Sequence, residues 1–227
     1  MKRIILLLII LILIQDSYAQ LWNQVQKAVA SDRAITDRFG SSVSISGDYA
    51  IVGAPQEDHD VFGNNNLINS GSAYIFERNS NGTWNQVQKI VASNRHYEDY
   101  FGCSVSISMN YLVVGAYRED HDSAGVNGMQ STGSAYIYER DASGTWNQVQ
   151  KIVASDRALQ DQFGSSVSIS GNNIIIGAPR EDEDASGLNT IPSAGSAYIF
   201  KRDNNGIWNQ VQKIVASDRN NADWFGT

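Results

Sequence analysis

One sequence pattern recurs along the chain every 62 residues, without an insertion or deletion. Its most constant part is the hexapeptide WNQVQK, which starts at Trp22, Trp84, Trp146 and Trp208. A period of this length indicates one supersecondary unit copied along the chain, in which each copy buries its apolar face against its neighbours. The pattern therefore favours a repeated scaffold that presents loops over an enzyme with one catalytic constellation.

Each unit contains four short strand patterns separated by turn residues. In the first unit they cover residues 42–46, 49–53, 72–77 and 84–90. The first strand reads SVSIS in all three units, and the Gly47-Asp48 pair after it suits a two-residue hairpin. Four antiparallel strands per unit predict the blades of a β-propeller, an all-β fold. A parallel β-helix has much shorter coils, and helical repeats would need a 3.6-residue periodicity that residues 20–227 do not sustain.

The first 19 residues have the pattern of a secretory signal peptide. Lys2 and Arg3 precede an aliphatic run over residues 4–14, and Ser17 and Ala19 provide small residues for cleavage. We therefore predict a signal peptide over residues 1–19 and a secreted or cell-surface protein over residues 20–227. A membrane anchor is the alternative, but a spanning helix needs about 20 apolar residues. No membrane span is expected after the signal is removed.

The charge and cysteine content exclude several classes of protein. The formal net charge is −7, so the surface repels phosphate backbones and nucleic acid is not expected as a partner. Cys103 is the single cysteine, which rules out a disulfide framework within one chain. It occupies the position of Ser41 and Ser165 in the other units and is interpreted as a small packed residue.

Three segments run from a Phe-Gly pair to the end of the second strand, over residues 39–55, 101–117 and 163–179. They resemble FG-GAP repeats, the units of the seven-bladed propeller of integrin α subunits and of many exported bacterial proteins. The resemblance is closer to the bacterial form, and it implies a β-propeller; the ligand-binding function of integrins does not follow from it. It covers essentially the whole chain after the signal peptide.

The ring of blades is expected to be incomplete. The repeat cores cover residues 39–90, 101–152 and 163–214, and a fourth unit begins at residue 225. An orphan outer strand, Trp22–Ala28, precedes the first unit. Because propellers have roughly four to eight blades, we expect a fragment of a longer gene product. As an open arc it would expose apolar faces on its end blades and self-associate.

Acidic residues after each second strand are candidates for a calcium site. In the third unit, Asp182, Asp184 and Ser186 place oxygen atoms at positions 1, 3 and 5 of an EF-hand-like loop, as calcium prefers, and Thr190 stands at position 9. The glutamate that usually completes such a loop is replaced by Ser193. The alternative is a solvated loop capped by Asx turns. The integrin calcium loop itself has no counterpart here, because the turn after each first strand has only two residues.

A second group of candidates is expected on one rim of the propeller. The loops between second and third strands and the linkers between blades should emerge on the same face. Asp58, Asp60, Asp120 and Asp122 are therefore candidate ligand-face residues. His59 and His121 lie in the same acidic runs, but no second histidine stands at ligand spacing.

The linkers contain recurring charged residues. An aspartate two positions before each Phe-Gly is expected to accept backbone N–H groups in the turn. A recurring arginine is expected to pair with these aspartates across blades; the positions are Asp37, Asp99, Asp161 and Asp223, and Arg33, Arg95, Arg157 and Arg219.

The function predicted from these features is an exported, non-catalytic adhesion or ligand-binding module. Its partner would be an extracellular protein or a glycan. No nucleophile elbow, phosphate loop or metalloprotease motif is present in the sequence, which argues against an enzyme. Two alternatives remain: an accessory propeller of a larger secreted enzyme, and a structural component of the cell envelope.

Overall fold

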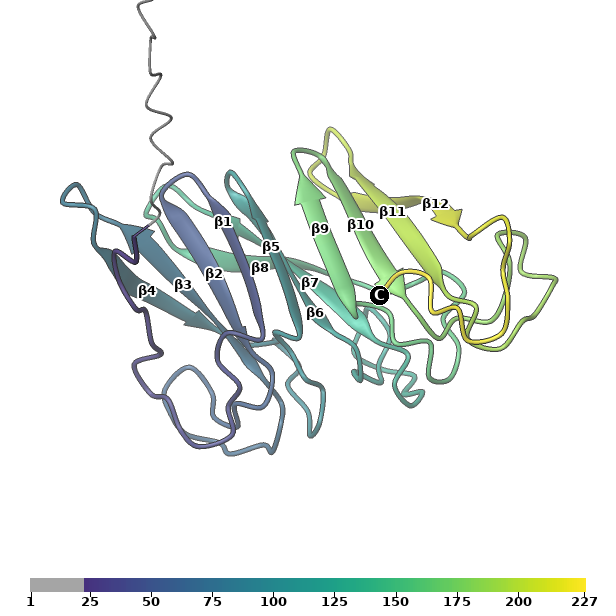
Figure 1. Cartoon of the computed structure of the whole chain (residues 1–227), viewed down its shortest axis with the longest axis horizontal. Coiled ribbons are helices and arrows are strands. Elements are labelled where there is room, and N and C mark those ends of the chain that lie inside the picture. Colours follow the sequence, from purple (N-terminus) through teal and green to yellow (C-terminus); the bar gives the residue numbers. More distant parts are fainter. Residues whose placement is uncertain (1–22) are drawn as a thin grey trace, which may run out of the picture.

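Short strands build three four-stranded antiparallel sheets, each within one of the predicted repeat cores (Figure 1). A computed structural model describes residues 23–227, and these contain no helix. Each sheet is one blade with its strands in sequence order. The first blade contains β1 (Ser42–Ser46), β2 (Tyr49–Ala54), β3 (Ser72–Arg78) and β4 (Trp84–Ile90). The second contains β5 (Ser104–Ser108), β6 (Tyr111–Ala116), β7 (Ser134–Arg140) and β8 (Trp146–Ile152). The third contains β9 (Ser166–Ser170), β10 (Asn173–Ala178), β11 (Ser196–Arg202) and β12 (Trp208–Ile214).

The blades stand side by side, with their first strands β1, β5 and β9 adjacent (Figure 1). No sheet of the described residues closes into a ring, so the all-β, incomplete propeller arc predicted from the sequence is confirmed. The predicted strand bounds agree with the observed ones to within one residue. The predicted signal peptide and Trp22 lie outside the described residues.

Two glycines of neighbouring units touch where the blades are closest. The Ser42 hydroxyl donates a hydrogen bond of 2.8 Å to the carbonyl oxygen of Gly102 in the next unit. A Cβ atom added to Gly53 would lie 2.0 Å from this same oxygen, closer than any real contact. Gly102 also has a φ of +90°, a conformation that favours glycine. The Phe-Gly of one unit therefore docks on the Gly-Ala of the preceding unit, and both glycines are needed.

Apolar side chains fill the space between blades farther from this contact. Between the first and second blades, Ile51 and Ile75 pack against Leu112, Tyr136 and Trp146, all of them buried. The same arrangement recurs between the second and third blades. The core therefore lies between the sheets, as expected for repeats that bury their faces against neighbours.

A β-bulge in the fourth strand explains the constant hexapeptide WNQVQK. In β4, Gln86 lies opposite Phe76 whereas Gln88 lies opposite Ile75, with the register shift between them. Because adjacent residues of β3 face opposite sides of the sheet, the two glutamines also face opposite sides. The bulge recurs in the other two blades.

The two glutamines connect each blade to both neighbours. Gln86 exchanges two hydrogen bonds of 2.9 Å with Ser31 in the preceding linker. Gln88 exchanges two with the backbone of Trp146 in the next blade, at 2.8 and 2.9 Å. One bulge thus allows a single strand to hold the segment before it and the blade after it.

The prediction of an outer strand at the N-terminal end, over Trp22–Ala28, is wrong for the described residues. Residues 23–28 form no strand, because no third strand lies beside them to complete a ladder within the described residues. They still occupy the position of an outer strand. Gln26 exchanges two hydrogen bonds with the backbone of Trp84, as Gln88 does with Trp146.

The outward faces of the end blades expose apolar residues that are buried elsewhere. Val43 in the first blade is 68% exposed, whereas its counterpart Val105 in the second is 7% exposed. Ile175 in the third blade is 41% exposed, whereas Ile51 at the same position in the first is fully buried. These faces lack the neighbour that each interior face has.

We expect Gly115→Ala to destabilise the fold by about 3 kcal/mol or more, because overpacking of a rigid contact forces the backbone apart. The new methyl group would lie 2.0 Å from the carbonyl oxygen of Gly164 and 2.3 Å from the Ser104 hydroxyl. Gly128→Ala is the control, since its nearest neighbour lies 3.7 Å away. Urea denaturation measures both variants, and equal midpoints would contradict the close contact.

We also expect the chain to self-associate through its exposed end faces. Sedimentation velocity should show a concentration-dependent rise in mass. The double variant Ile45→Asp, Ile175→Asp should reduce this association, because each charge lies on one exposed face. Leu188→Asp, on an exposed loop away from these faces, is the matched control. A monomer at every concentration would refute the prediction.

Candidate functional site

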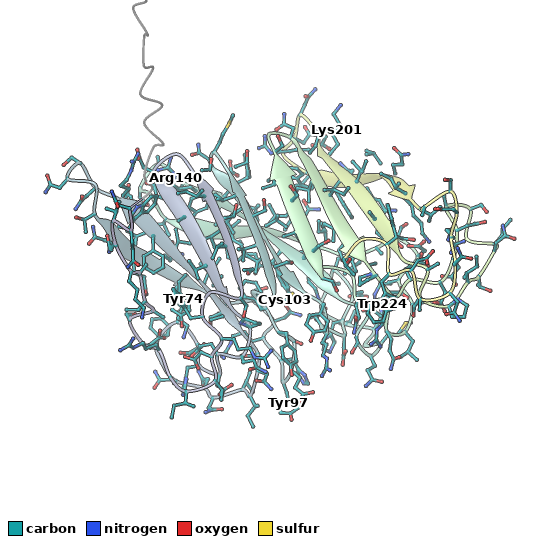
Figure 2. All side chains as sticks on the ribbon, in the orientation of Figure 1. Tyr74, Tyr97, Cys103, Arg140, Lys201 and Trp224 are labelled. Atoms are coloured by element: carbon teal, nitrogen blue, oxygen red, sulfur yellow. The ribbon has the colours of Figure 1, made fainter. Side chains whose placement is uncertain are left out.

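The loops between second and third strands and the linkers between blades emerge together on one side of the arc, as the sequence predicted (Figure 1). We call this surface, made of residues 55–71, 91–101, 117–133, 153–163, 179–195 and 215–225, the loop rim. In Figure 2, Tyr97 lies on this side, whereas Arg140 and Lys201 lie at the opposite edge. The loop rim therefore lies at the opposite edge of the blades from the two-residue turns that join the first and second strands.

The recurring linker arginines fasten the loops of the rim. Arg95 donates to the carbonyl oxygens of Asp58 and Asn65, at 2.7 and 3.2 Å, and to the Ser70 hydroxyl at 2.8 Å. Arg157 and Arg219 make the equivalent bonds in the next two units. The expected pairing of these arginines with the linker aspartates is therefore wrong, because loop carbonyls take the guanidinium hydrogens instead.

The linker aspartates cap the turn before each Phe-Gly, as expected. Asp99 accepts the backbone N–H of His96 at 2.6 Å, and Asp161 accepts that of Ala158 at 2.5 Å. Both carboxyl groups are buried, and burial raises the pKa of each to about 8. These two groups are therefore largely protonated at neutral pH.

Each acidic run, over residues 57–60, 119–122 and 181–184, begins with a buried glutamate. Glu119 accepts the Ser134 hydroxyl at 2.6 Å and the Lys151 ammonium at 2.9 Å. The ring of His121 lies 3.1 Å from the same carboxylate. Glu57 and Glu181 have equivalent serine and lysine partners. The network is an internal support of the rim and is not open to a ligand.

In the third unit a glutamate replaces the histidine of this network. Glu183 stands where the other units have His59 and His121. A hydrogen bond with the Glu181 carboxyl, together with burial, raises the pKa of Glu183 to about 7. His59 and His121 each lie 3.1 Å from a buried carboxylate, as expected for histidines within an acidic run.

The last aspartate of each acidic run forms the centre of an Asx turn. Asp60 accepts the backbone N–H groups of Phe62 and Asn64, and Asp122 makes the same pair of bonds one unit later. Asp184 accepts those of Ser186 and Leu188 and also the Ser186 hydroxyl. An asparagine five residues on adds a side-chain bond in all three units. This spacing is visible in the sequence and could have identified the turn.

The candidate calcium residues of the third loop are therefore engaged with the protein. Four donors occupy the carboxylate of Asp184, and Asp182 accepts the backbone N–H of Ser193 at 2.7 Å. Ser186 directs its hydroxyl hydrogen to Asp184, and Thr190 has no hydrogen bond within residues 23–227. No group of three or more acidic, histidine or cysteine side chains in these residues is arranged to hold a metal ion. These contacts fit the Asx-turn alternative, and calcium binding remains a prediction.

The other candidate ligand-face residues are half-buried. Asp58 accepts the backbone N–H of Asn69 at 2.8 Å, and Asp120 accepts that of Ser131 at 2.6 Å. Each aspartate thereby closes its loop on itself. All four candidates, Asp58, Asp60, Asp120 and Asp122, lie on the loop rim, but their main contacts are structural.

A hollow on the loop rim between the second and third blades was not predicted. It has a volume of about 380 Å³, and its lining includes Tyr97, Arg118, Asp120, Gln130 and Arg180. The signal in the sequence is a departure from the repeat. The second linker reads His-Tyr-Glu over residues 96–98, where the first and third linkers read Ala-Ile-Thr and Ala-Leu-Gln.

The buried linker aspartates predict how stability depends on pH. Because the unfolded aspartate has a pKa near 3.9, the folded chain holds extra protons between about pH 4 and pH 8. The free energy of unfolding should therefore fall as the pH rises through this window. Asp99→Asn with Asp161→Asn keeps the acceptor oxygens and should flatten the dependence. Melting temperatures at pH 5 and pH 8 test this, and an unchanged slope in the double variant would contradict it.

The FG-GAP repeat family matches the chain over residues 22–76, 84–138 and 146–200. No curated protein matches the chain significantly. Two solved structures to which the chain is similar are a periplasmic gluconolactonase of Pseudomonas aeruginosa, with 15% identity, and a protein of Lactobacillus plantarum, with 11% identity. Each has a TM-score of 0.36 and covers 79% of this chain, which spans 58% and 57% of theirs. No helix long and apolar enough to cross a membrane occurs in residues 23–227. Three family matches in strict register, each covering the first two strands and most of the third strand of one blade, establish that the chain belongs to the FG-GAP repeat family.

Proposed function

We propose that the chain is an exported, non-catalytic recognition module that binds an extracellular protein or a glycan through the loop rim. The observation that carries this proposal is how the rim is built. The same arginine, aspartate and glutamate contacts fix the loops in each unit. The loop tips, by contrast, differ between units and are exposed; they include Phe62 and Leu188.

The recurring carboxylates support a role without catalysis. Glu57, Glu119 and Glu181 are bonded to lysine and serine, and Asp60, Asp122 and Asp184 are bonded within their turns. A general acid or base must reach a substrate within hydrogen-bond distance. Groups that are buried or already engaged in this way are poorly placed for that task. The signal peptide pattern of residues 1–19 supports export.

Calcium is retained as a candidate ligand of the third loop only. There Asp182, Asp184 and Ser186 supply oxygen atoms close together in the sequence. Binding would require Asp184 to exchange the donors of Ser186 and Asn189 for the ion. A calcium-dependent change in recognition would therefore involve opening of the Asx turn.

Arrays of glycans and extracellular proteins, probed with the tagged chain, test the proposal. The double variant Phe62→Ala, Leu188→Ala should reduce the strongest signal at least tenfold, because both side chains project from the rim. Met109→Ala, in an exposed hairpin away from the loops, should leave it unchanged. Parallel arrays with calcium and with a chelator test the ion. Blank arrays in both conditions, or an equal loss in the control, would refute recognition through the rim.

A further inference from the structure

The hollow between the second and third blades has the size of a small-molecule site. Its volume of about 380 Å³ lies within the roughly 300–1,000 Å³ of such sites. Residues from both linkers and both loops contribute to the lining. The backbone around it is fixed, since Gln160 and Gln162 donate their N–H groups to the carbonyl oxygens of Gln130 and Ser131, at 3.0 and 3.1 Å. The hollow is therefore a formed feature of the rim.

The second linker departs from the repeat at this hollow. His96, Tyr97 and Glu98 replace residues that are small, apolar or uncharged in the neighbouring units. Nearby Tyr117 also departs from the repeat, since Pro55 and Pro179 occupy its position in the other units. Departures from the repeat that gather around one hollow of the loop rim indicate a specific role for this part of the surface.

The charges that line the hollow balance. Arg118 pairs with Glu98 at 3.3 Å and lies over the rings of Tyr100 and Tyr117, at 5.1 and 5.8 Å. Arg180 and Asp120 add one charge of each sign. A strongly anionic or cationic ligand would meet a like charge in either case, which disfavours it. The balance favours a neutral ligand.

The remaining groups suit a ligand with many hydroxyl groups. The side-chain amides of Gln130 and Gln160 each donate and accept, and neither has a partner within residues 23–227. Tyr97 is 52% exposed and contributes an aromatic ring to the lining of the hollow. A sugar has hydroxyl groups that both donate and accept, and a C–H face that packs on an aromatic ring.

We propose that this hollow binds a single neutral sugar residue of a glycan. The inference rests on the proposed recognition function and specifies its ligand class. Tyr97 packs against the sugar ring, while Gln130, Gln160 and the carboxylate of Asp120 bond its hydroxyl groups. Arg118 is a positioning residue, held over the tyrosines by Glu98.

Saturation-transfer NMR tests the inference with methyl glycosides of glucose, galactose, mannose and N-acetylglucosamine. The triple variant His96→Ala, Tyr97→Leu, Glu98→Gln gives the second linker the sequence of the third, Ala158-Leu159-Gln160, so its folding is safeguarded. The matched control Ile35→Leu, Thr36→Gln makes the same change in the first linker. We expect at least one glycoside to bind, with at least a tenfold weaker affinity in the triple variant and an unchanged affinity in the control.

Three results would overturn the inference. They are the absence of binding to any of the four glycosides, equal binding by the triple variant, and binding only to charged probes such as methyl glucuronide or an acidic peptide. The proposed function is distinguished from the inference by the arrays. One informative result is that array signals survive in the triple variant and are lost in the double variant Phe62→Ala, Leu188→Ala. This result would support recognition by the loop rim and rule out binding in the hollow.

Discussion

The contact between two glycine backbones of successive units sets the geometry on which the rest of the arc depends. The carbonyl oxygen of Gly102 approaches Gly53 so closely that no side chain fits between them. The Ser42 hydroxyl completes the contact, and β1 and β5 are thereby held next to each other. Because the blades nearly touch here, they must diverge elsewhere, and larger side chains are needed to fill the widening gap. Tyr136 and Trp146 occupy that gap and are buried between the first and second blades.

A chain built in this way is stabilised mainly by contacts between neighbouring units. The bulge in each fourth strand strengthens these contacts, because it turns one glutamine toward the preceding linker and the other toward the next blade. Because stability comes from contacts between neighbouring units, the two ends of the arc, which have fewer such contacts, are less stabilised. Within the described part of the chain, residues 23–28 keep the glutamine contact to Trp84 without pairing with a strand, and Ile175 is 41% exposed.

The sequence was sufficient for the strands, because alternation and tight turns define them locally and three copies confirm each boundary. It was not sufficient to predict how deeply a side chain is buried. Glu119 and Asp122 belong to the same acidic run, yet the first is buried against Lys151 and the second closes an exposed turn. The arginine contacts were also missed, since a guanidinium can bind a backbone carbonyl as readily as a carboxylate, and the sequence shows only the side chains. The hollow could not be predicted from the repeat, because the repeat contains only what the units share, whereas Tyr97 and Glu98 are positions where the units differ.

This last difference has a physical basis. In a repeated scaffold, a residue that recurs in every unit serves a contact that every unit makes, and such contacts are those that hold the blades and loops together. Asp60, Asp122 and Asp184 illustrate this, since each closes the same turn with the same donors. A partner that binds once per chain needs a surface that occurs once per chain. Specific recognition by an FG-GAP arc is therefore expected to depend on residues that break the period on the loop rim, while the periodic residues fix the positions from which they act.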